Sequence, residues 1–273
     1  MSAAREEGRP ARPEVSLGGP LAPADFVERP NRFLVRCRLA GGAGDRARRG
    51  APGARGAESD PPGTVASGDV VEAHLPDPGR LEELLVPGRR LLLRPADGAG
   101  RRTAWTAVVV RTPEDDGWVS LDTTLPNRLV GKALRSGFMD ELAGWELAGS
   151  EVALGASRLD FVLSRPSGPR MALEVKSVTL VVDGVGRFPD AVTARGARHV
   201  RELAEVAGRD GWAAGVLFVA QRSDVERVVA DEEIDPEFAR ALDAAREAGV
   251  RCLARRCSVT PGSVRMGEAV PAG

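Results

Sequence analysis

Apolar and polar residues alternate along the first half of the chain, a pattern typical of half-buried β-strands. The clearest run extends from Arg32 to Leu39, where Arg36 and Arg38 stand between apolar neighbours. The inward positions of this strand are expected to be Phe33, Val35, Cys37 and Leu39. Further strands are predicted at Val70–Leu75, Arg90–Arg94, Trp105–Arg111 and Trp118–Asp122, with a short helical turn near Leu81–Leu85.

The number and shortness of these strands predict a small β-barrel that resembles an OB-fold, a shape often used to bind oligonucleotides. A barrel with a purely structural role is the alternative. Residues 41–67 are rich in Gly, Ala, Arg and Pro and predict a flexible insertion between two strands. Residues 1–25 lack periodicity and predict a disordered leader. The OB-like domain is therefore expected over 26–112.

A helical period replaces the alternation from Asn127 onward and predicts an α/β domain over 113–273. The expected helices are 128–145, 190–207 with Asp190 as N-cap, and a helix from Asp235 and Pro236 to Ala248. The expected strands are Glu151–Leu154, Leu159–Leu163, Met171–Val175, Thr179–Val182, Ala214–Ala220 and Val250–Ala254. This order of elements predicts helices packed on a mixed sheet.

Composition narrows the class of protein. No stretch is long and apolar enough for a membrane span, and the first residues do not resemble a signal peptide, so a cytoplasmic protein without a membrane partner is expected. Three cysteines without a CxxC pair indicate reduced thiols. The net charge is −1, but residues 30–112 carry 14 Arg against 9 acidic residues, while 113–273 carry 20 basic against 25 acidic residues. The first domain is the better candidate for contact with phosphates.

Asp160, Glu174 and Lys176 form the most chemically suggestive group. Glu174 and Lys176 are two apart on a predicted strand, so they share a sheet face, and a short turn brings Asp160 opposite them. Two carboxylates and the Val175 carbonyl could hold Mg²⁺ or Mn²⁺, which would activate water for attack on a phosphodiester, with Lys176 stabilising the transition state. The alternative is an ordinary exposed Asp and a surface Glu–Lys pair.

The surrounding sequence adds further candidates. Of 38 basic residues only Lys132 and Lys176 are lysine, which favours a specific use for a compact ammonium group at Lys176. Glu151, at another strand start, could be a further ligand or acid. His199 shares a predicted helix face with Arg195 and could contact phosphate or water. A solvated helix face is the alternative.

Longer motifs identify a resemblance to the sugar fermentation stimulation protein family (SfsA), over roughly residues 30–270 apart from the insertion. The matching segments are Arg32-Phe33, Ala73-His74, Leu125–Val130, Ser157–Phe161, Glu174–Lys176, Val178–Leu180, Phe188–Thr193, Arg195-Gly196 with His199, and Gln221–Asp224. Two departures stand out: the loop after His74 reads Pro-Asp-Pro-Gly-Arg where the family usually has Pro-Asn-Thr-Gly-Ser, and Ser177 replaces an Asn.

The resemblance implies an N-terminal OB-like domain, a C-terminal domain similar to PD-(D/E)XK nucleases, DNA binding, and a described role in regulating sugar metabolism. The expected nucleic-acid contacts are Arg32, Arg36, Arg38, His74, Asn127, Arg128, Arg158, Arg195, Gln221 and Arg222. The leading hypothesis is a DNA-binding protein with a Mg²⁺-dependent nuclease-like site. A non-catalytic DNA-binding regulator is the main rival, and an oligosaccharide- or nucleotide-binding protein is a third reading. RNA as a ligand and a homodimer remain open.

Overall fold

Two units divide the chain at a different place from the one that the sequence predicts. The computed structural model describes residues 10–41, 68–96, 100–114, 116–154 and 157–273. The first unit to be considered comprises residues 18–78 and 82–122, and the other comprises residues 1–17, 79–81 and 123–273. The predicted boundary at residue 113 therefore moves to residues 122 and 123, because strand β7 still belongs to the first sheet.

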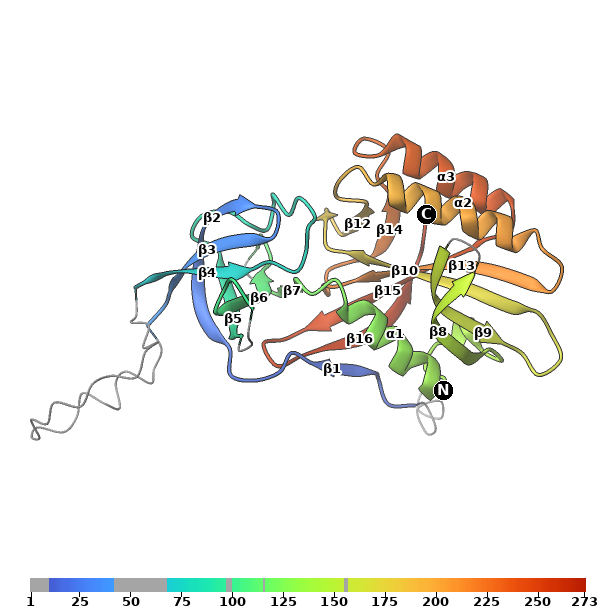
Figure 1. Ribbon diagram of the computed structural model, residues 1–273, viewed down its shortest axis with the longest axis horizontal. Coiled ribbons are helices and arrows are strands. Elements are labelled where there is room, and N and C mark those ends of the chain that lie inside the picture. Colours follow the sequence, from blue (N-terminus) through green and yellow to red (C-terminus); the bar gives the residue numbers. More distant parts are fainter. Residues whose placement is uncertain (1–9, 42–67, 97–99, 115, 155–156) are drawn as a thin grey trace, which may run out of the picture. The chain divides into compact units, whose positions relative to one another are not determined.

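The unit of residues 18–78 and 82–122 is a β-barrel (Figure 1). Its strands are β2 (Ala22–Asn31), β3 (Leu34–Leu39), β4 (Val70–His74), β5 (Arg90–Pro95), β6 (Trp105–Arg111) and β7 (Trp118–Ser120). They follow the order β4-β3-β2-β5-β6-β7, and an additional pairing of β4 with β6 closes the barrel. The alternating pattern is confirmed in β3, where Val35 and Cys37 are fully buried, but Phe33 is 45% exposed.

The other unit is built on a mixed seven-stranded sheet, as predicted, in the order β1-β16-β15-β13-β10-β9-β8. Its strands are β1 (Glu14–Ser16), β8 (Glu146–Leu154), β9 (Ser157–Ser164), β10 (Arg170–Val178), β13 (Trp212–Ala220), β15 (Arg251–Val259) and β16 (Ser263–Val270). The neighbours β10, β13 and β15 run parallel, and the outer pairs are antiparallel. A small second sheet contains β11 (Val181–Val182), β12 (Val185–Phe188) and β14 (Arg227–Ala230).

Helices cover both faces of the large sheet. Helices α2 (Ala194–Ala207) and α3 (Pro236–Glu247) share one hydrophobic core with side chains of β10 and β13. Helix α1 (Leu125–Ser136) packs near β8 and β10 on the opposite face, where its Gly131 lies against the Phe161 ring. The helix predicted over 128–145 is thus two elements, because Gly137 ends α1 in the left-handed conformation and a separate 3₁₀ turn spans Asp140–Leu142.

The prediction that residues 1–25 form a disordered leader is wrong for the described part of this segment. Within its described part, β1 adds an edge strand to the large sheet by pairing with β16, and β2 begins at Ala22. Val15 and Leu17 are buried while Ser16 is exposed, so a short alternating pattern was present at this point. The predicted insertion over 41–67 lies almost wholly outside the described residues.

Smaller local predictions were also tested. Helix α2 is capped by Thr193, whose hydroxyl accepts a hydrogen bond from the Gly196 N–H, and not by Asp190. Asp235 caps α3 as predicted. The Asp190 carboxylate instead lies against Gly79 in the loop after His74, where an added Cβ would force the carboxylate to move.

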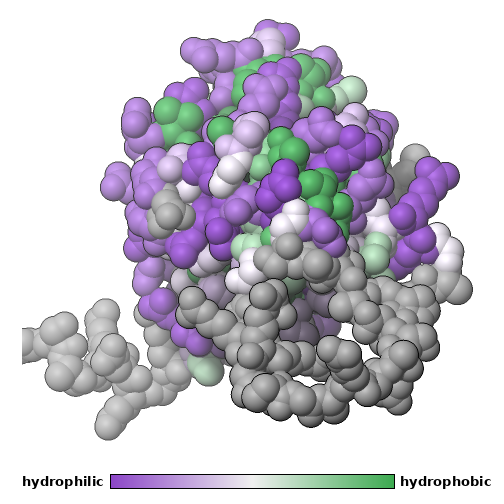
Figure 2. Space-filling view, turned by 90° about the vertical axis from the view of Figure 1, so that its left-hand side faces the viewer, coloured by the Kyte–Doolittle hydropathy of each residue, from purple (hydrophilic) through white to green (hydrophobic). Residues whose placement is uncertain are grey.

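Figure 2 shows one face of the molecule, on which hydrophilic residues predominate and smaller hydrophobic areas lie between them. Among the described helices, none combines the length and the apolar character that a membrane span needs.

Candidate functional site

Strand β10 carries Glu174 and Lys176 on the same face of the large sheet. Ala172 and Val178, at the same phase of the alternation, belong to the core that α2 and α3 cover. Glu174 and Lys176 therefore point toward α2, and Glu174 is 6% exposed. The prediction that the two residues share a sheet face is confirmed by their contact, since Lys176 Nζ lies 2.7 Å from Glu174 Oε1.

Asp160 lies where β9 and β10 part. The pairing of the two strands is regular up to Phe161 and Leu173, one residue before Asp160 and Glu174 would be opposite each other. Beyond this point the Asp160 side chain takes the place of a backbone acceptor: its Oδ2 accepts a hydrogen bond of 2.8 Å from the Val175 N–H. Its other oxygen, Oδ1, accepts a hydrogen bond of 2.8 Å from Asn127 Nδ2 on α1. Both carboxylate oxygens of Asp160 are thus held by donors.

His199 joins the group from helix α2. Its Nδ1 lies 2.6 Å from Glu174 Oε1, the same oxygen that contacts Lys176. Arg195 Nε donates to His199 Nε2 at 3.3 Å, and a guanidinium has no acceptor. His199 Nε2 must therefore be the acceptor, which leaves Nδ1 as the protonated nitrogen that donates to Glu174. The tautomer that carries its proton on Nδ1 satisfies both contacts of His199.

The electrostatic environment shifts the pKa values of the two carboxyl groups, Asp160 and Glu174, in opposite directions. Burial raises the pKa of Asp160, and the neighbouring charge of Glu174 raises it further. Burial also acts to raise the pKa of Glu174, but the Lys176 ammonium and the hydrogen bond from His199 outweigh it and hold that pKa below its ordinary value. Glu174 is therefore the carboxyl group whose ionised form is favoured, and its negative charge opposes ionisation of Asp160.

The donor set suits a hard divalent cation of the Mg²⁺ type. Within the described ranges no three residues among His, Cys, Asp and Glu gather as a ready metal cage. Mg²⁺ does not require one, because it keeps several waters and is commonly bound by one or two carboxylates. Asp160 and Glu174 supply those two carboxylates, and their mutual repulsion gives a reason for a cation to bind between them.

Glu151 does not join this group. Its neighbours Ser150 and Val152 pair with Phe161 and Leu159 of β9, but Glu151 has a φ of 55° and its exposed carboxylate pairs with Arg158 at 3.2 Å. The expectation that Glu151 takes part in catalysis is therefore not supported by its position.

Two of the expected nucleic-acid contacts are buried. Arg222 is 1% exposed, and its guanidinium pairs with Asp224 and donates to the Thr179 carbonyl. Gln221 is fully buried, and its amide donates to the Ser177 hydroxyl. Both side chains brace the end of β13, and their burial leaves them almost no surface with which to contact a ligand. Short polar motifs at strand ends do not reveal whether the side chains turn inward or outward.

Other predicted contacts lie at the surface. Arg128, on α1, and Arg195, on α2, are exposed. In the barrel unit, Arg36 is held by Glu28 and Glu72, and Arg38 donates to the Gly68 carbonyl. Arg32 lies over the Phe33 ring at 4.8 Å and His74 lines a surface pocket.

Thiol chemistry is not part of the site. The three cysteines are free, as expected, and burial raises the pKa of Cys37 and Cys257 to about 12. These two thiols are protonated at neutral pH and lie inside the protein.

The fold and the site together define a class: a two-domain protein that joins an OB-type barrel to a mixed α/β sheet with a carboxylate–lysine–histidine cluster. Residues 27–121 match the family described as the SfsA N-terminal OB domain, and residues 124–263 match the family described as the sugar fermentation stimulation protein RE domain. The chain belongs to the sugar fermentation stimulation protein (SfsA) family, which confirms the resemblance.

Known relatives span most of the chain. A sugar fermentation stimulation protein homolog from Chloroflexus aurantiacus is 42% identical over 262 residues, which cover 96% of this chain and 89% of the relative. A homolog from Shouchella clausii is 42% identical over 231 residues, covering 85% and 88%. A solved structure of Pyrococcus furiosus SfsA in complex with Ca²⁺ is similar with a TM-score of 0.74 and 26% identity, covering 95% of this chain and 99% of that one.

Proposed function

We propose that this protein binds polynucleotides, with DNA as the expected ligand, and hydrolyses phosphodiester bonds at the cluster around Glu174 with the help of a divalent cation. One observation carries the proposal: Asp160, Glu174, Lys176 and His199, from two strands and a helix, converge on one partly buried position. That combination of carboxylates, ammonium and imidazole matches the needs of phosphodiester hydrolysis, as in PD-(D/E)XK nucleases.

Asp160 and Glu174 are the residues that would hold the cation, Mg²⁺ or Mn²⁺. A divalent cation at this position supplies charge neutralisation for the phosphate and lowers the pKa of nearby water. The Pyrococcus furiosus relative was solved with Ca²⁺, another hard cation that takes oxygen ligands. Asn127 and the Val175 N–H keep the Asp160 carboxylate oriented for this task.

Lys176 and His199 act beside the carboxylates. The Lys176 ammonium neutralises Glu174 in the resting site and has further N–H groups to offer a phosphate oxygen. His199, held by Arg195, donates from Nδ1 to Glu174 and keeps that carboxylate in place. The exposed Arg195 sits one helical turn from His199, where its guanidinium is able to contact a phosphate of the bound strand.

A polynucleotide ligand agrees with the character of the barrel unit. The stretch from residue 30 to 112 carries a formal charge of +5 on a protein whose total charge is −1. Local rather than global positive charge would then attract the phosphates. Affinity should fall steeply as salt is raised, because binding releases counterions from the nucleic acid. An affinity that does not depend on salt would contradict this part of the proposal.

The test combines metal-dependent melting with cleavage assays. We expect Mg²⁺ or Mn²⁺ to raise the melting temperature of the wild type, since the cation binds the folded state, and to support cleavage of single- or double-stranded DNA. Glu174→Gln should lose both responses. Glu151→Gln is the matched control, because it removes a carboxylate of the same sheet that lies outside the cluster. If the wild type shows neither response with DNA or RNA, the enzymatic proposal is wrong, and DNA binding in its absence would favour a non-catalytic regulator.

A further inference from the structure

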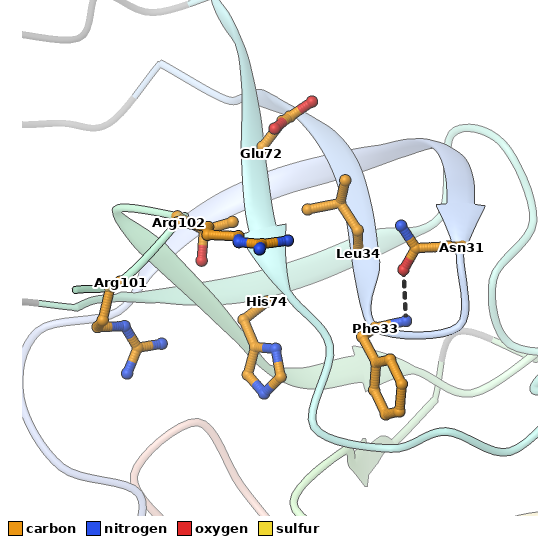
Figure 3. Close-up of a pocket in the computed structure, with 8 residues that line it drawn as sticks. Asn31, Phe33, Leu34, Glu72, His74, Arg101 and Arg102 are labelled. Carbon is orange, nitrogen blue, oxygen red and sulfur yellow. Dashed lines mark hydrogen bonds between the residues drawn. The ribbon is translucent and has the colours of Figure 1, made fainter.

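A pocket opens on the surface of the barrel unit, separate from the residues of the cluster (Figure 3). Its volume is about 520 Å³. Three parts of the barrel contribute to it: the turn between β2 and β3, strand β4, and the segment before β6. The lining residues are Asn31, Phe33, Leu34, Glu72, His74, Arg101, Arg102 and Thr103.

An aromatic side chain, Phe33, is exposed to solvent at the edge of this pocket, which is unfavourable for an apolar ring. Phe33 is 45% exposed although it stands at the apolar phase of β3, where the next inward positions are fully buried. Asn31 Oδ1 accepts a hydrogen bond of 2.9 Å from the Phe33 N–H and so fixes the turn that presents the ring. Arg32 lies over the ring at 4.8 Å. In Figure 3, Phe33 and His74 extend to the same side of their strands.

The charged groups of the pocket favour an anion. Arg101 Nη2 donates to Thr106 Oγ1 at 2.8 Å, which holds this guanidinium near the pocket. Arg102 is drawn between Glu72 and His74 in Figure 3. The single acidic side chain of the lining, Glu72, pairs at 3.1 Å with Arg36, whose guanidinium it shares with Glu28. Two arginines still outnumber this one carboxylate beside an exposed aromatic ring.

We propose that this pocket binds one unstacked nucleotide of a single-stranded nucleic acid, with its base on Phe33 and His74 and its phosphate at Arg101 and Arg102. The inference rests on the proposed function in taking the ligand to be a polynucleotide, and it adds the requirement for an unpaired base. Bases in a duplex are stacked on both sides and do not offer a face to a protein ring, whereas single strands bind by stacking on aromatic side chains and by phosphate contacts. A neutral sugar could accept hydrogen bonds from the two guanidinium groups but would leave their positive charge without a counter-ion.

The experiment measures binding of fluorescently labelled oligodeoxythymidylate, and of a labelled blunt-ended duplex of the same length, to the full chain in EDTA. We expect the single strand to bind more tightly than the duplex. Phe33→Ala should weaken single-strand binding roughly tenfold, from the loss of one stacked base, and leave duplex binding nearly unchanged. Phe33→Trp should restore single-strand binding, since it retains a stacking surface.

Two controls separate the pocket from general effects. Val70→Ala removes another exposed apolar side chain of the same unit outside the pocket and should change neither affinity. Arg102→Gln should weaken single-strand binding more than Arg90→Gln, which removes the same charge from a residue paired with Asp25. Melting temperatures of all variants check folding.

Equal losses of Phe33→Ala on both ligands, or no loss on either, would overturn the pocket proposal while leaving polynucleotide binding intact. Absence of binding to both ligands by the wild type would instead defeat the proposed function, and the pocket proposal with it.

Discussion

At the scale of single residues, the orientation of Asp160 depends on a donor that sits on a different element. The Asn127 amide reaches the carboxylate from α1, and this hydrogen bond lowers the pKa of Asp160 against the raising effects of burial and Glu174. Asn127 was expected to contact nucleic acid, but its amide donates to Asp160. Its role here is to position a carboxylate.

Asn127→Ala should therefore weaken cation binding about 10- to 100-fold, as the loss of a hydrogen bond to a metal ligand commonly does. The pKa of Asp160 should rise further, because a group that stabilises its charged form is removed. Calorimetric titration with Mn²⁺ measures the affinity. Arg128→Ala changes the next residue of the same helix, which is exposed, and is the control. Equal affinities for wild type and Asn127→Ala would contradict the positioning role.

The second prediction at this scale concerns Lys176, whose side chain is only 11% exposed. Lys176→Arg keeps the positive charge but replaces a compact ammonium with a larger planar group. DNA affinity should remain, while cleavage should fall about 100-fold or more if the ammonium stabilises the transition state. Lys132→Arg is a close control, since the other lysine of the chain is exposed and contacts the Glu14 carbonyl. Full cleavage by Lys176→Arg would remove Lys176 from the mechanism.

At the scale of elements, a buried ion pair ties the 3₁₀ turn at Asp140–Leu142 to strand β15. Arg255 is 2% exposed, and its Nε and Nη2 contact the two carboxylate oxygens of Glu141 at 2.7 and 2.6 Å. The guanidinium also lies over the Phe138 ring at 5.0 Å. The segment that follows α1 is thereby fastened to the sheet.

Glu141→Gln leaves Arg255 without its counter-ion and should lower the free energy of unfolding by about 3 kcal/mol at neutral pH. Burial acts to raise the pKa of Glu141, but Arg255 outweighs it and the pKa is lowered. Its stabilisation is therefore present above the ordinary pKa of 4.5 and disappears as the pH falls through the lowered value.

Urea unfolding at several pH values checks this prediction. The difference between wild type and Glu141→Gln should shrink on acidification. Glu237→Gln, which breaks an exposed pair with Arg201, should cost less than about 1 kcal/mol and serves as the control. A difference that grows toward low pH would have the wrong sign for this explanation.

At the scale of the whole molecule, the first strand of the chain forms an edge of a sheet whose other strands all come from the second half of the chain. Strand β1 pairs with β16, so Glu14 and Arg265 lie opposite each other and form an ion pair. Val15 and Leu17 are buried there. The N-terminal segment is part of the core of the larger unit.

Deletion of residues 1–17 should therefore destabilise that unit by roughly 3 kcal/mol, from the apolar surface of Val15 and Leu17 that leaves the core. Thermal unfolding followed by circular dichroism measures the loss. Deletion of residues 1–9 leaves β1 intact and is the matched control. An unchanged melting temperature after the longer deletion would restore the interpretation of this segment as a leader.

The sequence by itself determined the features that depend on local order. Alternation placed Glu174 and Lys176 on one face because successive side chains of a strand point to opposite sides, and the short connection from β9 to β10 brought Asp160 near them. Alternating short strands also sufficed to predict the barrel. The family motifs, which are long and continuous, gave the family directly.

Only the tertiary structure decided contacts between residues distant in sequence and the direction of side chains at element ends. Asn127 reaches Asp160 across 33 positions, and His199 reaches Glu174 across 25, because packing of α1 and α2 on the sheet brings them there. The same packing buries Arg222, while turn geometry leaves Phe33 exposed. Local sequence preferences do not tell which element, distant in sequence, will pack over a residue. That packing decides whether a polar side chain is exposed to a ligand or buried in a structural hydrogen bond.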